Sequence, residues 1–139
     1  MLGLVSRAEQ ARIVEKLIAY YKQLYPGVDF TREELELSAK EIGNLLYTYA
    51  GTEEEASARE KMIAISKAIK WGYDTPIVIL RKPRHGLDIL LDGHRRARFA
   101  FENGMGWKAV ALVPNVEFEF GVEKMILGRI AELFGKKPA

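Results

Sequence analysis

The sequence predicts an α+β fold in a single domain, with a small mixed sheet, packed helices and a C-terminal helix. Segments with apolar residues at helical spacing alternate with short β-branched runs, which indicates helices and strands within one chain. The length of 139 residues fits one domain with a sizeable core, and 48% apolar with 29% charged residues is ordinary for a globular protein. We expect a largely helical N-terminal extension at residues 1–50, a core at 51–115 and the C-terminal helix at 116–139.

The first expected element is an amphipathic helix at residues 6–25. Ser6 and Glu9 have the spacing of a capping box, and Pro26 followed by Gly27 ends the helix. The expected apolar face consists of residues at helical spacing: Ile13, Leu17, Ile18, Tyr21 and Leu24.

Residues 31–49 allow two interpretations. Thr31 and Glu34 form a second possible capping box, and apolar residues recur every three or four positions up to Tyr49, which favours a helix. The competing interpretation is a short strand at 34–38, because apolar residues also alternate at Leu35, Leu37 and Ala39.

A further helix is expected from Thr52 to near Gly72. It begins with three glutamates, which suit the positive end of a helix dipole. Its apolar face is expected to consist of Met62, Ile63, Ile65, Ala68 and Ile69.

The central part of the chain predicts a β-hairpin followed by a helix and a third strand. The apolar runs at 75–80 and 87–91 are the hairpin strands, and the basic segment 81–86 between them is the turn. A helix is expected at 93–103 and a strand at 107–114. The expected C-terminal helix has an apolar stripe formed by Val122, Met125, Ile126, Ile130, Leu133 and Phe134.

Composition excludes several classes of function. The absence of cysteine excludes disulfides, thiolate metal sites and thiol catalysis. Apolar runs are too short to span a bilayer, and the N-terminus does not resemble a secretory signal, so we expect a cytoplasmic protein that does not bind a membrane. The net charge of +2 does not by itself demand a nucleic-acid partner. Many Glu, Lys and Arg residues beside few Asn and Gln suggest a thermophilic source.

The segment Asp-Gly-His-Arg-Arg at residues 92–96 is the strongest candidate site. A buried strand that enters a helix through Gly93 presents backbone N–H groups to an anion. Arg95 and Arg96 add donors that suit phosphate oxygens, and His94 can donate or relay a proton because its ordinary pKa lies near neutrality. These residues predict a phosphate-binding corner for a nucleotide.

The flanking residues of this segment have more than one interpretation. Asp92 is expected to cap the helix, or to reach Mg²⁺ on a bound nucleotide. Arg98 is expected on the same outward side as Arg95, one turn further along. The alternative is a solvated basic turn, but cations at a helix N-terminus oppose the dipole, which favours an anion that receives them.

Residues 75–114 resemble the ParB/sulfiredoxin superfamily. The run Gly-His-Arg-Arg-Ala-Arg-Phe-Ala at 93–100 is similar to the Gly-Glu-Arg-Arg-x-Arg-x-Ala box of ParB proteins. Residues 92–96 are more similar to the Asp-Gly-His-His-Arg of archaeal ADP-dependent serine kinases, which share that fold. The chain departs from the family in having no sulfiredoxin cysteine, and at this length we expect neither the DNA-binding and dimerisation domains of ParB nor a second kinase lobe.

The resemblance implies a nucleotide site and a catalytic glutamate. In the family this box binds nucleotide phosphates, so ATP, ADP or CTP is the expected cofactor, with or without Mg²⁺. The expected binding residues are Thr75, Asp92, Gly93, His94, Arg95, Arg96 and Arg98. In the kinases a glutamate ahead of the matching helix resembles a general base. Glu53, Glu54 and Glu55 lie in that neighbourhood and no single one of them aligns uniquely; the catalytic candidates are Glu54 and Glu55, together with His94.

Three functions follow as alternatives. The first is a nucleotide-dependent phosphotransferase or hydrolase that acts on an unidentified small-molecule acceptor. The second, less favoured, is a ParB-like DNA-binding or nuclease domain that uses the basic turn at 81–85. The third is a nucleotide sensor without catalysis, in which the terminal helices form a homodimer interface or pack on the sheet of their own chain.

Overall fold

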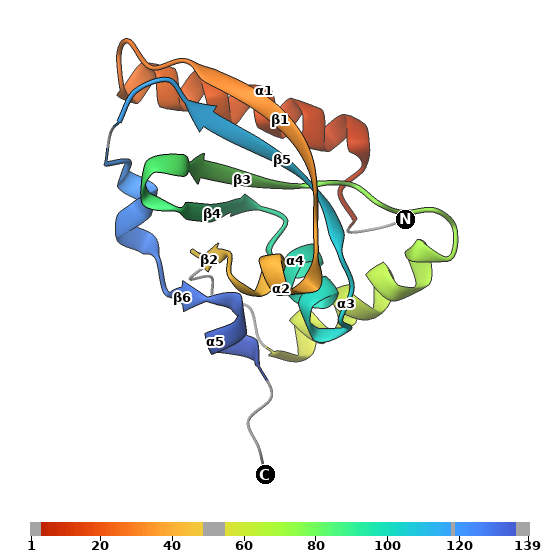
Figure 1. Cartoon of the computed structure of the whole chain (residues 1–139). Helices are drawn as coiled ribbons and strands as arrows, with labels where there is room; N and C mark the ends of the chain where they lie inside the picture. The colour runs from red at the N-terminus through yellow and green to blue at the C-terminus, as the bar shows by residue number, and fades with distance from the viewer. Residues whose placement is uncertain (1–3, 49–54, 118, 136–139) are drawn as a thin grey trace.

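The computed structural model describes residues 4–48, 55–117 and 119–135. Within these residues five α-helices and a six-stranded mixed sheet form one α+β unit (Figure 1). The α-helices are α1 (Arg7–Leu24), α2 (Ala39–Gly43), α3 (Glu55–Ile69), α4 (His94–Glu102) and α5 (Ile130–Phe134). The strands are β1 (Phe30–Leu37), β2 (Leu46–Tyr47), β3 (Ile77–Lys82), β4 (Leu87–Asp92), β5 (Trp107–Pro114) and β6 (Gly128–Arg129). Two 3₁₀ turns, η1 (Pro83–His85) and η2 (Gly121–Met125), complete the described elements.

The strands follow the order β1-β5-β3-β4-β2-β6 across the sheet. The β1–β5, β3–β4 and β2–β6 pairs are antiparallel, whereas β5–β3 and β4–β2 are parallel. The central strand β3 is almost wholly buried. Its end meets the turn η1, which returns the chain into β4, the strand that leads into the candidate site.

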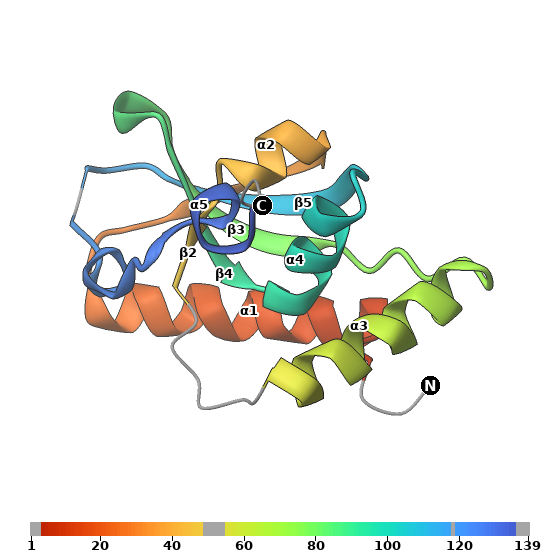
Figure 2. The ribbon, with the colours of Figure 1, turned by 90° about the horizontal axis from the view of Figure 1, so that it is seen from below.

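Helices cover both faces of the sheet. Alternate side chains of β3 point to opposite faces, so Ile77 and Ile79 join one apolar cluster while Val78 and Leu80 join others. On one face the sheet packs against α1, and on the other against α2, α4 and α5, with α3 beside α4. Figure 2 shows α1 along one side of the strands and α2 on the opposite side. The β4–α4 junction therefore lies between α1 and α3.

Several sequence predictions are confirmed. The helix expected at 6–25 is α1, with the capping box formed by Ser6 and Glu9, although Leu24 is exposed. The hairpin is β3–β4, the helix expected at 93–103 is α4, and the strand at 107–114 is β5. Within the residues that the structure describes, no helix is long and apolar enough to cross a membrane.

The favoured prediction of a helix at residues 31–49 is wrong. Residues Phe30–Leu37 form β1, which pairs with β5 along its whole length, and only the short α2 follows. Pairing with β5 explains the strand, because a neighbouring strand satisfies backbone groups that local capping signals cannot reveal. The capping box lies instead at Ser38 and Glu41, ahead of α2. The N-terminal part of the chain is therefore not a largely helical extension, since β1 and β2 belong to the sheet.

The prediction of a single C-terminal helix at residues 116–139 is also wrong. The segment forms η2, then β6, then the short α5. Backbone bonds to the β2 region interrupt the expected stripe, because the amides of Leu127 and Ile130 donate to the carbonyls of Tyr47 and Leu45 at 2.8 and 3.0 Å. Gly128 lies between these bonds with a φ of 148°, which is incompatible with a helix.

Helix α3 agrees with the prediction in part. Its expected start at residues 52–54 lies outside the described residues, and it ends at Ile69. Met62, Ile65 and Ala68 are buried as expected, whereas the side chain of Ile63 is 55% exposed.

Candidate functional site

A cavity of about 360 Å³ lies where β4 passes into α4. It is lined by residues 91–96 of that junction, by Leu4 and Val5 ahead of α1, by Lys61 and Ile65 of α3, and by Tyr73. The structure therefore brings together the whole predicted segment 92–96 at one cavity. Lys61 is an additional basic lining residue that the sequence analysis missed, because nothing in the α3 pattern shows which neighbour that helix faces.

Gly93 makes the turn between strand and helix possible. Its φ is 91°, in the left-handed region, and an added Cβ would lie 2.7 Å from Arg96 Nη2 and 2.8 Å from Ile77 Cγ2. Gly93 is also the residue that caps α4, and since it has no side chain it supplies no capping hydrogen bond. The positive end of the α4 dipole consequently opens on the cavity.

Asp92 does not cap α4, which corrects the sequence prediction. It is the last residue of β4, and its carboxylate accepts a hydrogen bond from Arg96 Nη2 at 3.2 Å. The carboxylate is therefore engaged in orienting an arginine. In the described parts of the chain no group of three carboxylate or histidine side chains could hold a metal ion. Asp92 could contact Mg²⁺ only together with ligand oxygens, as Mg²⁺ on bound phosphates usually requires.

Arg96 lies beneath the cavity instead of pointing out of it. It is only 4% exposed, and its Nη2 donates to Gln10 Oε1 at 2.7 Å as well as to Asp92. Gln10, on α1, is 2% exposed. Among the residues that the structure describes, neither Arg96 Nη1 nor Gln10 Nε2 has a hydrogen-bond acceptor. Buried donors of this kind are costly. Of the two residues, Arg96 lines the cavity and Gln10 does not.

Gln10 was missed by the sequence analysis, although a signal existed. It falls four residues before Val14 and eleven before Tyr21, in the buried stripe of α1. A polar residue within an apolar helical stripe indicates a buried hydrogen-bonding partner elsewhere in the fold. The partner itself, 86 positions away along the chain, could not be read from the pattern.

His94 is held as a neutral imidazole. Thr48 Oγ1 donates to the carbonyl of Leu90 at 2.9 Å, so its contact with His94 Nε2 at 3.3 Å requires that nitrogen to carry the proton. The ring also meets Tyr47 edge-on, at 5.0 Å between centroids. Burial lowers the pKa of His94 to about 4, with Asp92 raising it and Arg96 lowering it by smaller amounts. The expectation that His94 exchanges a proton near neutrality is therefore wrong for the ligand-free protein.

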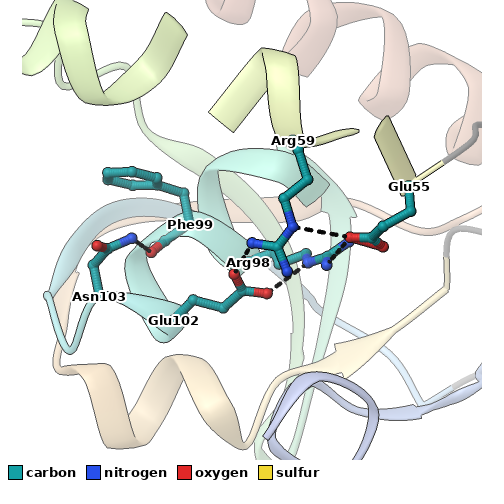
Figure 3. A network of polar contacts seen from close by, with 6 residues as sticks. All are labelled: Glu55, Arg59, Arg98, Phe99, Glu102 and Asn103. Carbon is teal, nitrogen blue, oxygen red and sulfur yellow. Dashed lines mark hydrogen bonds and ion pairs between the residues drawn. The ribbon is translucent and has the colours of Figure 1, made fainter. Parts of the chain in front are cut away.

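Arg98 faces away from the cavity, which corrects its expected position beside Arg95. Its Nε donates to Glu102 at 2.8 Å and its Nη2 donates to Glu55 (Figure 3). The guanidinium lies 4.3 Å from the ring centre of Phe134. The hydrogen bond from Arg98 lowers the pKa of Glu55. Glu55 is consequently held at the α3–α4 contact, outside the lining of the cavity.

The remaining predicted residues lie at different distances from the cavity. Arg95 is half-buried and lines it. Thr75 is buried ahead of β3, where its carbonyl accepts a hydrogen bond from Trp107 Nε1 at 2.8 Å, and it lines a neighbouring hollow. Glu54 lies outside the described residues.

No protein-family model, curated protein or solved structure matches this chain.

Proposed function

We propose that this cavity binds the phosphate groups of a nucleotide, ATP, ADP or CTP, in a ParB/sulfiredoxin-like domain. The observation that carries the proposal is the uncapped N-terminus of α4, which opens on a cavity that Arg96 lines, together with the buried Arg96 Nη1, which has no acceptor within the described residues. An anionic oxygen supplies the acceptor that Arg96 and the helix dipole favour.

The lining gives each contact a separate role. The first-turn amides of α4 receive one phosphate, while Arg95 and Lys61 contribute positive charge at the cavity wall. Arg96 is fixed from below by Gln10 and Asp92, so little side-chain freedom is lost when a ligand arrives.

The reaction that we propose is phosphoryl transfer to an unidentified acceptor, or hydrolysis. A phosphate beside His94 would raise the pKa of the imidazole, because a nearby negative charge favours the protonated form. The protonated ring could then donate to the phosphoryl group. Glu54 is the remaining candidate for the base, since Glu55 is engaged by Arg98.

The hairpin tip offers a weaker case for binding DNA. Each of its basic side chains contacts a carboxylate: Arg81 with Asp88, Lys82 with Glu123, and both Arg84 and His85 with Glu117. This pairing reduces the charge available to nucleic-acid phosphates.

Calorimetric titration with ATP, ADP, CTP and inorganic tripolyphosphate tests the proposal. Arg95→Gln and Lys61→Gln are expected to weaken binding roughly tenfold or more each, the size of a lost charge-assisted hydrogen bond. Arg84→Gln is the matched control, because Arg84 is 80% exposed on the hairpin tip and should leave affinity unchanged. Absence of binding to the wild-type protein, or binding that is unaltered in both cavity variants, contradicts the proposal. Turnover of the bound nucleotide, measured in the wild type and in His94→Gln, then tests the reaction.

A further inference from the structure

We propose that the base of the nucleotide stacks on Trp71, in a hollow beside the phosphate cavity; this inference rests on the proposed function. Trp71 is 88% exposed, the most exposed of the large apolar side chains in the described part of the chain. It follows the end of α3, on the turn that leads toward β3 (Figure 1).

The backbone that carries Trp71 is well ordered by hydrogen bonds although the indole is in solvent. The amides of Trp71 and Tyr73 donate to the carbonyl of Ala68 at 2.9 and 3.1 Å, and that of Gly72 donates to Ile69 at 2.9 Å. Gly72 has a φ of 90°, as in the left-handed termination of a helix. A fixed backbone that presents an exposed aromatic ring loses little entropy when a planar ligand stacks on it.

Trp71 lines a hollow of about 600 Å³ that adjoins the phosphate cavity. Leu4 and Tyr73 line both spaces, so the hollow and the cavity are neighbours on either side of these two residues. The wall that they share is fixed, because the hydroxyl of Tyr73 donates to the carbonyl of Val5 at 2.9 Å.

The charges at the two spaces determine which end of a nucleotide each would take. The N-terminus of α1 borders the hollow, but Ser6 and Glu9 close it with a full capping box. The guanidinium of Arg7 is paired with Asp74 at 3.0 and 2.5 Å. The capped α1 terminus and the Arg7–Asp74 pair make the hollow unfavourable for an anion, which suits an uncharged base. The uncapped N-terminus of α4 suits the phosphates.

Comparison of nucleotides with tripolyphosphate tests this inference. Base stacking on an aromatic side chain corresponds to about 5- to 150-fold in affinity. Trp71→Ala should lower the affinity for ATP, ADP or CTP by a factor in that range and leave the affinity for tripolyphosphate unchanged. Trp71→Phe, which keeps an aromatic ring, should lose less nucleotide affinity than Trp71→Ala. Nucleotides should also change the fluorescence of Trp71, the exposed member of a pair whose other tryptophan, Trp107, is only 6% exposed.

Ile63→Ala is the matched control, because Ile63 is an exposed apolar residue of α3, the helix that ends just before Trp71, and it lies outside both linings. Nucleotide binding that depends on Arg95 but not on Trp71 overturns the stacking inference and leaves the proposed function standing. Equal weakening of nucleotide and tripolyphosphate by Trp71→Ala also overturns it, because the indole would then support the fold. Failure of both ligands to bind the wild type overturns the proposed function itself.

Discussion

At the scale of single residues, His94 is the group whose chemistry depends most on its surroundings. Burial lowers its pKa to about 4, and the Nε2 proton is directed at Thr48. The imidazole therefore enters any reaction as a neutral group whose other nitrogen is an acceptor. A bound phosphate changes this state, because it compensates the cost of a buried positive charge.

The neutral imidazole predicts a specific loss of stability in acid. The folded-state pKa of about 4 lies below the ordinary value near 6.5, so the unfolded chain takes up the proton first as the pH falls. The stability due to neutral His94 is complete above pH 6.5 and is lost progressively between pH 6.5 and 4. Between pH 7 and 5 the wild-type free energy of unfolding should fall by about 2 kcal/mol more than that of His94→Gln.

Urea unfolding at the two pH values measures this difference. His85→Gln is the control for the loss of a histidine, because His85 is exposed on the hairpin tip, outside the lining of the cavity. Equal pH slopes for the wild type and His94→Gln would show that the imidazole titrates normally.

The sequence predicted which residues of segment 92–96 lie together at the β4–α4 junction, but it did not predict their orientations. A glycine between an apolar run and a helical segment usually marks a tight turn from strand to helix, so the turn at Gly93 could be predicted from the sequence. The inward direction of Arg96 could not, because α4 is buried over five consecutive residues from Arg96 to Ala100 and has no single apolar stripe at its centre. Helical periodicity separates inside from outside only where one face meets solvent.

At the scale of elements, Arg98 connects three helices. It lies on α4 and donates to Glu55 at the start of the described α3 (Figure 3). Its guanidinium also lies over the ring of Phe134 of α5. Glu102, one turn along α4, completes the contact. A planar guanidinium can make these contacts together, whereas an ammonium group cannot.

Arg98→Lys should lower the free energy of unfolding by about 1–3 kcal/mol, since the buried guanidinium loses its hydrogen bonds to two carboxylates and its contact with a ring. Tripolyphosphate affinity should change by less than about twofold, because Arg98 faces away from the cavity. Arg59→Lys is a close control: Arg59 contacts the same two carboxylates but is exposed, so its effect on stability should stay below about 1 kcal/mol. Denaturant unfolding gives the change in the free energy of unfolding, and calorimetry gives the change in tripolyphosphate affinity. A large loss of affinity in Arg98→Lys would contradict the assignment and show that Arg98 contributes to ligand binding.

The elements that sequence patterns missed are those fixed by distant partners. Leu35 and Leu37 fit both a helix and a strand, and β1 is too exposed over its first residues to show clear alternation. Its pairing with β5, about 75 positions along the chain, decides between them. The bonds from Leu127 and Ile130 to the β2 region have the same effect at the C-terminus.

At the scale of the whole molecule, the cavity depends on the assembled fold. Its lining comes from the segment ahead of α1, from α3, from Tyr73 and from the β4–α4 junction. The hydrogen bond between Gln10 and Arg96 joins α1, on one face of the sheet, to α4 on the other. A ligand that satisfies these two residues would stabilise contacts between segments far apart in the chain.

The most direct test of phosphate binding at this junction is an NMR titration of the ¹⁵N-labelled protein with tripolyphosphate. The backbone amides of Gly93, His94 and Arg95 should shift with saturation, and the pKa of His94 should rise above its ligand-free value of about 4. Amides at this turn that do not respond, or larger shifts at the hairpin around Arg84, would contradict an anion site at the N-terminus of α4.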